Sequence, residues 1–235
     1  ESFRWLLGLY RTWSFLLFTQ SDARCVDKAM VALLLAESLG DRTYAARTAI
    51  EIHFMAGALA IGSKAELRSL ADRISAIPGS DGDLPAWRLA LHEVSPRSEW
   101  PLSLKYLFGR SRQGRLAEQG VPASAPWGAW ASGEPRAAWV LDRSLAALFD
   151  LDQQLHHSFK DDSPILKMVE LLARAGRPIE IPDAFEQAWG IRWSGVVHPN
   201  TLSVALCRLN ARSASYSIRR KNGLLALGRP GYISD

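Results

Sequence analysis

The sequence predicts a mostly helical chain in two parts, an all-helical N-terminal domain and a C-terminal domain of α+β structure. Apolar residues recur at helical spacing through the first half, whereas short strand-like runs appear beside helices from residue 137 onward. Between the halves, residues 120–136 are rich in glycine, proline and small side chains, the composition of a domain boundary. We therefore expect a helical domain over 1–119, a linker over 120–136 and a second domain over 137–235.

Composition limits the class of protein. A chain of 235 residues that is 48% hydrophobic can build one large core or two smaller ones. It has no run of about 18 apolar residues, so we expect no membrane span. Arg4 and Arg11 interrupt the aromatic N-terminus and no small-residue cleavage site follows, which argues against a signal peptide. The scarcity of cysteine, with only Cys25 and Cys207, predicts a reducing, cytoplasmic setting.

Four helices are predicted in the first 77 residues. The first covers 3–18, as one helix or as two that break at Gly8. The second is capped by Ser21 or Asp22, runs to Leu39 and stops at Gly40. A third helix runs over 43–61. Ser63 and Glu66 have the spacing of a capping box, in which each side chain bonds the other residue's backbone N–H. The box opens a fourth helix that ends near Ile77.

The remainder of the N-terminal half offers weaker signals. Short helices are predicted over 87–93, 102–108 and 113–119. Trp127 and Trp130 are unusual in a free linker, so we expect them to pin it against one of the domains. Alanine- and leucine-rich helical hairpins with short links are similar to tetratricopeptide-type repeats, although no clean repeat of about 34 residues is present. A plain helical bundle is an equally good interpretation of this half.

The first part of the C-terminal half combines strands with helices. Three short strands are predicted over 139–142, 144–150 and 154–158. Ser163-Pro164 then starts a helix, because serine caps free backbone donors and proline at the first helical position lacks such a donor. Gly176-Arg-Pro178 ends this helix, and a second one is expected over 183–189. We expect Trp189, at its end, to be buried beneath the helix that follows.

A third helix over 200–212 and a hairpin complete the C-terminal half. The helix has a core side, formed by Leu202, Ala205, Leu206 and Leu209, and an exposed side, formed by Asn200, Ser203, Val204, Cys207, Arg208 and Ala211. Asn222-Gly223 joins two short strand-like runs and is a strong signal for a type I′ hairpin turn, which needs positive φ at both residues. Two helices, a presented helix and a hairpin follow each other in the order of a winged helix-turn-helix.

Several segments of residues 137–235 carry a resemblance to a known family. They are Val140-Leu-Asp142 with Leu151-Asp-Gln153, Leu171-Leu-Ala-Arg-Ala-Gly-Arg-Pro178, Phe185-Glu-Gln-Ala-Trp-Gly190 and Asn200-Thr-Leu-Ser-Val-Ala-Leu-Cys-Arg-Leu209. In this order and spacing, they resemble the winged-helix output domain of OmpR/PhoB-type response regulators. The resemblance covers about two fifths of the chain and implies a domain that binds duplex DNA, with its recognition helix in the major groove. The receiver domain that usually accompanies it is absent.

Charge supports a polyanionic partner for the same region. Residues 190–235 hold seven basic residues and one acidic residue, whereas residues 1–135 are nearly balanced with 15 basic and 14 acidic residues. A local basic surface suits duplex DNA, although it can also be a solvated face that keeps a domain soluble. The candidate DNA-binding residues are Asn200, Ser203, Arg208, Arg212, Arg219, Arg220 and Lys221.

The presented helix departs from the family pattern. Recognition helices usually expose several Arg, Lys, Asn or Gln side chains, which read base edges and bind phosphates. Here Val204, Cys207 and Ala211 occupy much of the exposed side, and this favours weak sequence readout. The three basic residues before Asn222 would still bind phosphates. A second interpretation is that the domain no longer binds DNA and docks a protein partner.

Catalytic chemistry finds no support in the sequence. His156 and His157 are neighbours in a predicted strand, so their rings should face opposite sides. His53 lies on a helical stripe, and His198 precedes a proline in a predicted loop. No histidine has a cysteine or carboxylate at ligand spacing, and no glycine-rich phosphate loop is present. We expect no enzyme activity, no metal and no cofactor.

These observations lead to two hypotheses of function. The preferred one is a DNA-binding transcriptional regulator whose helical N-terminal domain binds an effector or a protein partner. The alternative is an adaptor or regulatory subunit that acts by protein–protein interaction. Because the chain begins at Glu1 without a methionine, we expect it to be part of a longer protein.

Overall fold

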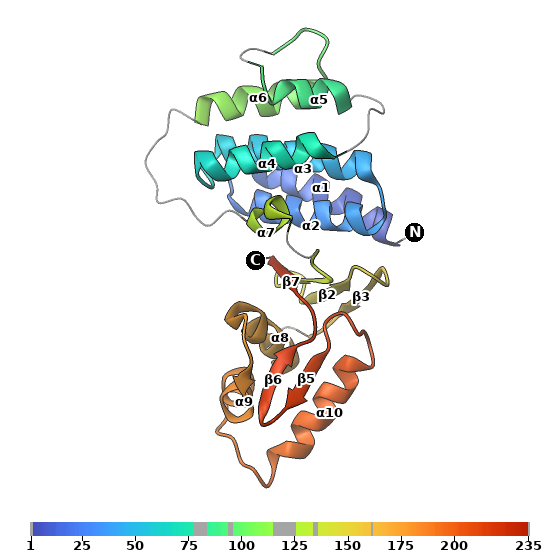
Figure 1. Ribbon diagram of the computed structural model, residues 1–235, viewed down its shortest axis with the longest axis vertical. Helices are drawn as coiled ribbons and strands as arrows, with labels where there is room; N and C mark the ends of the chain where they lie inside the picture. The colour runs from blue at the N-terminus through green and yellow to red at the C-terminus, as the bar shows by residue number, and fades with distance from the viewer. Residues whose placement is uncertain are drawn as a thin grey trace. The chain divides into compact units, whose positions relative to one another are not determined.

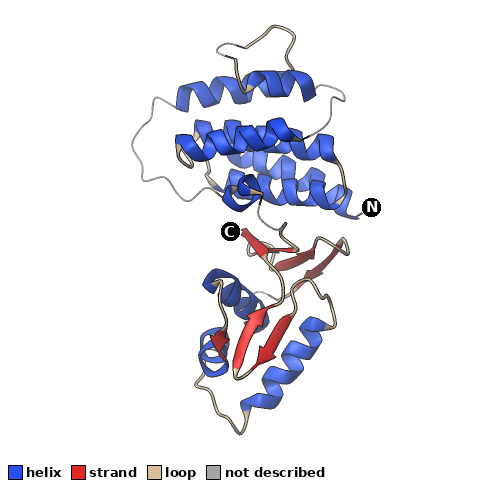
Figure 2. Cartoon of the chain, viewed as in Figure 1, coloured by secondary structure: helices blue, strands red, loops and turns tan. Residues whose placement is uncertain are grey.

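The chain divides into two compact units, unit 1 from Glu1–Pro135 and unit 2 from Arg136–Asp235. The structure, a computed structural model, describes residues 2–77, 84–93, 96–114, 126–133, 136–160 and 162–234. Every described element of unit 1 is a helix, whereas unit 2 combines helices with short strands (Figure 2). No helix in these described ranges is both long and apolar enough to cross a lipid bilayer.

Unit 1 is a layered arrangement of helices (Figure 1). Consecutive helices of its first half pack on one another, and later helices pack against α3 and α4. The helices are α1 (Ser2–Thr19), α2 (Arg24–Ser38), α3 (Arg42–Ala58), α4 (Lys64–Ala76), α5 (Leu84–Ala90), α6 (Leu102–Gly114) and α7 (Gly128–Ser132).

The predicted helix boundaries of the first half hold to within a few residues. Helix α1 runs unbroken through Gly8. The capping box of α4 is confirmed, because Glu66 N donates to Ser63 Oγ at 3.2 Å and Ser63 N donates to Glu66 Oε2 at 2.7 Å. Helix α3 begins slightly earlier than predicted because the Asp41 carboxylate accepts from Tyr44 N at 3.0 Å.

Helix α3 forms the centre of unit 1, with nearly every residue from Ala45 to Gly57 buried. This helix is buried because it packs against α2, α4, α5 and α6. A side chain on Gly57 would place its Cβ 2.8 Å from Ser111 Oγ, so glycine permits the close approach of α6.

A buried charge on α3 is paired across the helical layer. Glu51 has a fully buried side chain, and the guanidinium of Arg11 donates to both of its carboxylate oxygens, with Nε at 3.1 and 3.0 Å. Burial by itself lowers the pKa of Arg11, but the hydrogen bonds and negative charge of Glu51 outweigh burial and raise the pKa above its ordinary value. A buried carboxylate is tolerated only with such partners, so this pair fixes α1 against α3.

The predicted linker of residues 120–136 contains a short helix in its described part. Residues 126–133 contain α7, which packs on α4 within unit 1 rather than spanning free between domains. Trp127 is fully buried and its Nε1 donates to the carbonyl of Glu66, while Trp130 Nε1 donates to Glu37 Oε1 at 2.9 Å. Two aromatic side chains with these partners hold the segment, as expected for Trp127 and Trp130.

The short helices also differ in extent. Helix α5 begins at Leu84 and ends at Ala90, several residues before the predicted range of 87–93. The two helices predicted over 102–108 and 113–119 are a single helix, α6, up to Gly114, and residues 115–119 lie outside the described ranges.

The described residues of unit 2 form two small sheets and three helices (Figure 1). One sheet has the strand order β3-β2-β1-β7, with β7 parallel to β1 and the other pairs antiparallel, and the second has the order β4-β6-β5. The elements are β1 (Trp139–Asp142), β2 (Ala147–Asp150), β3 (Leu155–Ser158), α8 (Pro164–Ala175), β4 (Ile179–Glu180), α9 (Ile181–Trp189), α10 (His198–Asn210), β5 (Ile218–Lys221), β6 (Leu224–Leu227) and β7 (Gly231–Ser234).

Local signals placed most of these elements correctly. Pro164 occupies the first turn of α8, and Gly176 ends it in the left-handed conformation at φ 61°. Lys221 pairs with Leu224, so Asn222-Gly223 is a two-residue turn, and its φ values of 52° and 77° confirm the positive values that a type I′ turn requires.

Strand β7 was not predicted and closes the first sheet. It pairs in parallel with β1, with Gly231 opposite Trp139. A Cβ at Gly231 would lie 2.0 Å from the Trp139 ring, so only glycine allows the buried indole to lie against this strand. Trp139 Nε1 also donates to the carbonyl of Arg229 at 3.1 Å. The C-terminal strand is therefore held by the indole as well as by strand pairing.

The burial expected for Trp189 was wrong. Its side chain is half-buried at the end of α9, and Phe185, one turn earlier, is the fully buried aromatic residue. The Phe185 ring stacks on Trp189 at 4.5 Å and on His198 at 4.7 Å between centroids. His198 lies in the first turn of α10 rather than in a loop, and its Nδ1 accepts from Ser194 N at 2.9 Å. This contact explains why α10 begins two residues earlier than predicted.

The division into units predicts that residues 136–235 fold alone. Expressed without unit 1, they should unfold in a single cooperative transition in urea, because unit 2 has its own buried core of aliphatic and aromatic residues. Circular dichroism and tryptophan fluorescence should give the same midpoint. A gradual transition without a baseline would contradict an autonomous second unit.

The aromatic stack predicts unequal effects of two substitutions in unit 2. Phe185→Ala should lower the free energy of unfolding by ~3–5 kcal/mol, the usual loss for a large buried aromatic ring. Trp189→Ala should cost clearly less, because part of its ring already meets solvent. Urea titration of both variants measures the difference, and an equal or larger loss for Trp189→Ala would show that Trp189 is the principal core residue.

Candidate nucleic-acid interface

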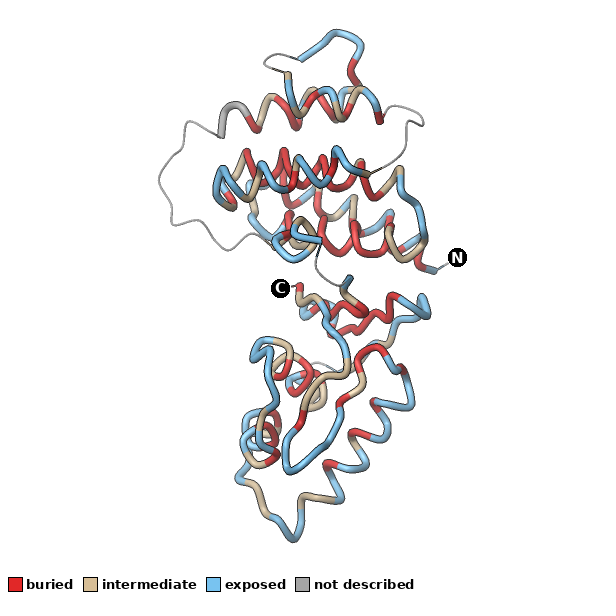
Figure 3. Tube along the Cα trace, viewed as in Figure 1, coloured by how far each residue is buried: buried red, intermediate tan, exposed pale blue. Residues whose placement is uncertain are grey.

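Helix α10 presents one side to solvent, as its sequence predicts. Leu202, Leu206 and Leu209 are buried, and Ala205 is half-buried beside them. All six residues of the predicted outer side are exposed, namely Asn200, Ser203, Val204, Cys207, Arg208 and Ala211. The alternation of buried and exposed positions along the helix is visible in the trace (Figure 3). The helix is thus held by its leucines and leaves a full face available for a partner.

The β5–β6 hairpin is attached to α10 through a side-chain amide. Asn210 Nδ2 donates to the carbonyl of Ile218 at 3.0 Å, and Ile218 N donates to Asn210 Oδ1 at 2.9 Å. The side-chain amide thus bonds the backbone N–H and C=O of Ile218, as a neighbouring strand would. These two bonds hold the start of β5 at the end of α10. On helical spacing, Ser203 and Cys207 share the flank of Asn210, so the hairpin follows this flank of α10.

A buried carboxylate holds the turn between α10 and β5. Asp150, at the end of β2, is fully buried. Ser213 Oγ donates to its Oδ2, and Ser215 Oγ donates to its Oδ1 at 2.9 Å. Backbone N–H groups of Asp152 and Gln153 also donate to Oδ1, at 3.0 and 2.9 Å. Four donors offset the cost of removing the charge from water and fix the turn on the first sheet.

Sequence reasoning missed this cluster, although a signal for it exists. Asp150 ends an otherwise apolar strand-like run, and Ser213-Ala-Ser215 follows the presented helix. Acidic and hydroxyl residues at the ends of helices and strands often bond nearby backbone groups. Asp150, Ser213 and Ser215 could each be explained in this way from the sequence alone. Nothing in the order of residues indicates that segments 63 positions apart satisfy one another.

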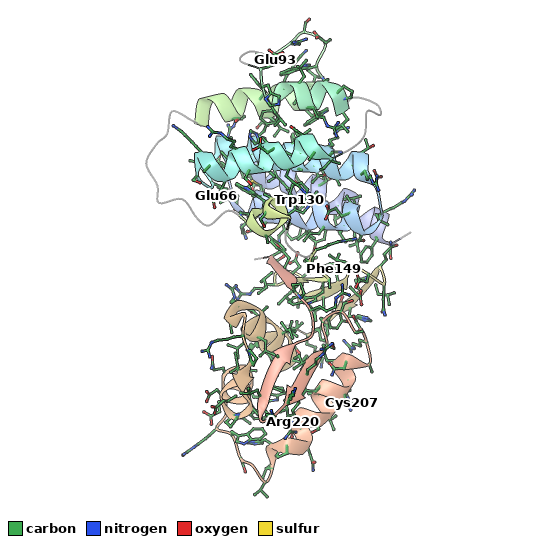
Figure 4. All side chains as sticks on the ribbon, viewed as in Figure 1. Glu66, Glu93, Trp130, Phe149, Cys207 and Arg220 are labelled. Carbon is green, nitrogen blue, oxygen red and sulfur yellow. The ribbon has the colours of Figure 1, made fainter. Side chains whose placement is uncertain are left out.

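The three cations of the hairpin project into solvent from its tip. Arg219, Arg220 and Lys221 are all exposed, directly before the Asn222-Gly223 turn. Side chains alternate along a strand, so Arg219 and Lys221 share one face and Arg220, opposite Leu225, lies on the other. Figure 4 labels Arg220 on the hairpin and Cys207 on α10. No hydrogen bond or ion pair with another described residue engages these three side chains.

The basic residues of α10 occupy the flank away from the hairpin. Arg208 and Arg212 are exposed one turn apart, and both line a groove that α10 forms with the start of α8. The guanidinium of Arg212 stacks over the Phe159 ring at 4.7 Å. Six of the seven predicted residues thus form two groups, Arg219, Arg220 and Lys221 at the hairpin and Asn200, Arg208 and Arg212 along the groove. Ser203 is exposed on the flank of α10 that faces the hairpin.

The sequence that contains α10 and the hairpin has basic residues but no acidic ones. Residues 187–234 include seven basic residues and no acidic one. Arg229 is the member of this set that pairs with a carboxylate, that of Asp152. The other cations of the set form no ion pair with a described residue.

The histidines do not converge on a reactive centre. His156 stacks on Phe149, and His157 packs edge-on against Tyr216, on opposite faces of β3 as predicted. His198 is engaged by Ser194 and Phe185. Within the described ranges, no three His, Cys, Asp or Glu side chains are grouped to hold a metal ion.

No protein-family model, no curated protein and no solved structure matches this chain. Its function is therefore inferred from the geometry and charge of its own residues.

The buried phenol beside Asp150 predicts a pH dependence of stability. Burial, with the negative charge of Asp150 adding to it, raises the pKa of Tyr216 to about 12. In the unfolded chain a tyrosine ionises near its usual pKa of ~10. The stability that comes from keeping this phenol neutral is therefore complete below about pH 10 and is lost as pH rises toward 12.

Tyr216→Phe removes this ionisation and tests it. From pH 9 to pH 11.5, wild type should lose on the order of 1–2 kcal/mol more stability than the variant, since one pKa unit corresponds to ~1.4 kcal/mol. Urea unfolding of both proteins at several pH values measures the difference. Other alkaline groups titrate in both proteins and cancel, so parallel curves would show that Tyr216 ionises normally.

Proposed function

We propose that unit 2 is a winged helix-turn-helix domain that binds duplex DNA. The observation that carries the proposal is the charge of residues 187–234, which include seven basic residues and no acidic one and contain the exposed helix α10 and the hairpin beside it. In this proposal α8 and α9 support α10 as the recognition helix, and β5–β6 is the wing. The order of these elements and the type I′ turn of the hairpin support it.

The two groups of candidate residues take different roles. An α-helix fits the major groove of B-form DNA, so Asn200, Ser203 and Arg208 on the exposed side of α10 would reach base edges. Arg219, Arg220 and Lys221 would bind phosphates from the hairpin. Arg212, stacked on Phe159, is held in place and would meet the backbone beside the helix.

Such a surface would bind DNA with little sequence preference. Phosphate contacts supply affinity without sequence information, and the hairpin cations are of this kind. On α10, Asn200 and Arg208 are the exposed residues whose side chains suit bidentate contacts with bases. We expect sequence discrimination, where present, to depend on these two.

Unit 1 has the build of a docking domain. Its helices stack around α3, and α1 leaves Trp5, Leu9 and Leu16 exposed on its surface. We infer that this unit binds an effector or a protein partner and that the whole chain acts as a transcriptional regulator. Its sequence has nearly equal numbers of basic and acidic residues, which suits a protein partner better than a nucleic acid.

A second function, as an adaptor, is favoured by one observation. The exposed side of α10 includes Val204, which is 49% exposed, together with Cys207 and Ala211. Apolar side chains on a helix face suit a protein partner more than a DNA groove, whose apolar contacts are limited to thymine methyl groups. In this case unit 2 is a protein-interaction module that does not bind DNA.

Replacing Arg219, Arg220 and Lys221 together by alanine tests the DNA proposal. Each phosphate contact releases counterions and contributes about −0.9 to the slope of log affinity against log salt, so the slope should flatten by roughly two to three units. Binding to every duplex should weaken alike. Titration of labelled random-sequence duplex at several salt concentrations measures both quantities.

A second triple variant with the same loss of charge is the control. Arg143, Lys167 and Arg174 are cations of unit 2 that pair with Glu170 or Asp162, so their replacement by alanine should leave the salt slope nearly unchanged. Absence of wild-type binding at low salt would exclude the DNA function and favour the adaptor. Equal slopes in the two triple variants would place the phosphate contacts away from the hairpin.

A further inference from the structure

A groove runs along α10 on the flank opposite the hairpin. It encloses 570 Å³ between α10, the first turn of α8, the end of α9 and the segment after β3. The residues that give it its chemistry are Phe159, Ile165, Trp189, Val204, Arg208 and Arg212. Each of its walls comes from a different element of the same unit, so the groove is part of the fold of unit 2.

The surface of the groove is largely apolar. Trp189 is half-buried, with its ring stacked on Phe185, and so offers a rigid aromatic surface. Ile165 faces it from α8, and Val204, 49% exposed, borders it from α10. Water forms few hydrogen bonds with such a lining. An apolar side chain that enters the groove would therefore displace this water favourably.

The rim of the groove is positively charged. Arg208, on α10, and Arg212, just after it, are four residues apart, and none of the described residues that line the groove is acidic. Arg212 is oriented by its stacking on Phe159, and no other described residue forms an ion pair or hydrogen bond with Arg208. An arginine held in this way loses less conformational freedom on binding a carboxylate.

We propose that this groove docks an acidic segment of a partner protein, in which aliphatic or aromatic side chains are flanked by carboxylates. The apolar anchors would contact Trp189, Ile165 and Val204, and the carboxylates would pair with Arg208 and Arg212. Duplex DNA would match the arginines but would leave the apolar lining without a partner. A neutral apolar ligand would match the lining but would leave the arginines unused.

The proposal stands apart from DNA binding by the hairpin, because its residues lie on the other flank of α10. Asn200 and Arg208 nevertheless line the groove and are also the candidate base contacts of α10. A docked acidic segment would therefore compete with duplex DNA for α10, and a partner of this chemistry would act as a negative regulator of a DNA-binding unit 2.

A labelled peptide with the core Leu-Leu-Phe-Leu and four glutamates on each side is a suitable probe. Fluorescence anisotropy with the full chain should detect saturable binding, and a peptide with serines in place of the apolar core should bind at least about tenfold more weakly. Val204→Asp should also weaken the first peptide by about tenfold or more, as should the double variant Arg208→Ala with Arg212→Ala.

The variant lacking Arg219, Arg220 and Lys221 provides the matched control, since it loses more charge but keeps the groove. It should bind the peptide within about threefold of wild type. Val204 and Arg208 are exposed, so circular dichroism and thermal unfolding should be unchanged in their variants. Equal binding of the two peptides, equal binding by Val204→Asp, or a larger loss in the hairpin variant would overturn the proposal, as would absence of binding. None of these outcomes bears on DNA binding by the hairpin.

Discussion

The exposed surface of unit 2 depends on the buried carboxylate of Asp150. An ionised group in the interior is stable only when hydrogen-bond donors replace its water, and here two serine hydroxyls and two backbone N–H groups do so. Ser213 and Ser215 lie in the turn between α10 and β5, while Asp150 ends a strand of the other sheet. The requirement to satisfy one charge therefore fixes where the helix ends and where the hairpin begins.

Asn210 adds a second polar constraint at the same place. Its amide bonds both backbone groups of Ile218, which commits the hairpin to one flank of α10 and leaves the other flank open. This asymmetry separates two kinds of surface on one helix. Cations without an apolar lining gather at the hairpin, whereas Arg208 and Arg212 border an apolar groove. In the two proposals, a polyanion and an acidic protein segment would bind different sites beside the same helix.

Unit 1 is held together mainly by packing around one buried helix. Its central helix, α3, is buried on all sides, and a glycine permits α6 to approach it closely. The fully buried Glu51 ties α3 to α1 through Arg11. Apolar packing and buried charges that have partners hold the described helices together, and the basic and acidic residues of 1–135 are nearly balanced. The two units accordingly suit different partners.

Local sequence signals determined most of the elements of this protein. A capping box, a proline at the start of α8, leucines at helical spacing in α10 and an Asn-Gly turn each act through bonds or contacts within a few residues. Their effect on the backbone does not require knowledge of the rest of the fold. Asn200, Ser203 and Arg208 were exposed as predicted for the same reason, since helical periodicity alone assigns them to the outer side of α10.

Tertiary structure decided how these elements combine. Pairing of β7 with β1, the choice of Phe185 over Trp189 for the core, and the packing of α7 within unit 1 all depend on segments distant in sequence. So do the Asp150 cluster and the groove beside α10, which draws residues from four segments. From the sequence, the role of each of these residues can be explained by its near neighbours alone. Their polar groups and apolar surfaces meet only when the chain folds and brings together segments that are tens of residues apart.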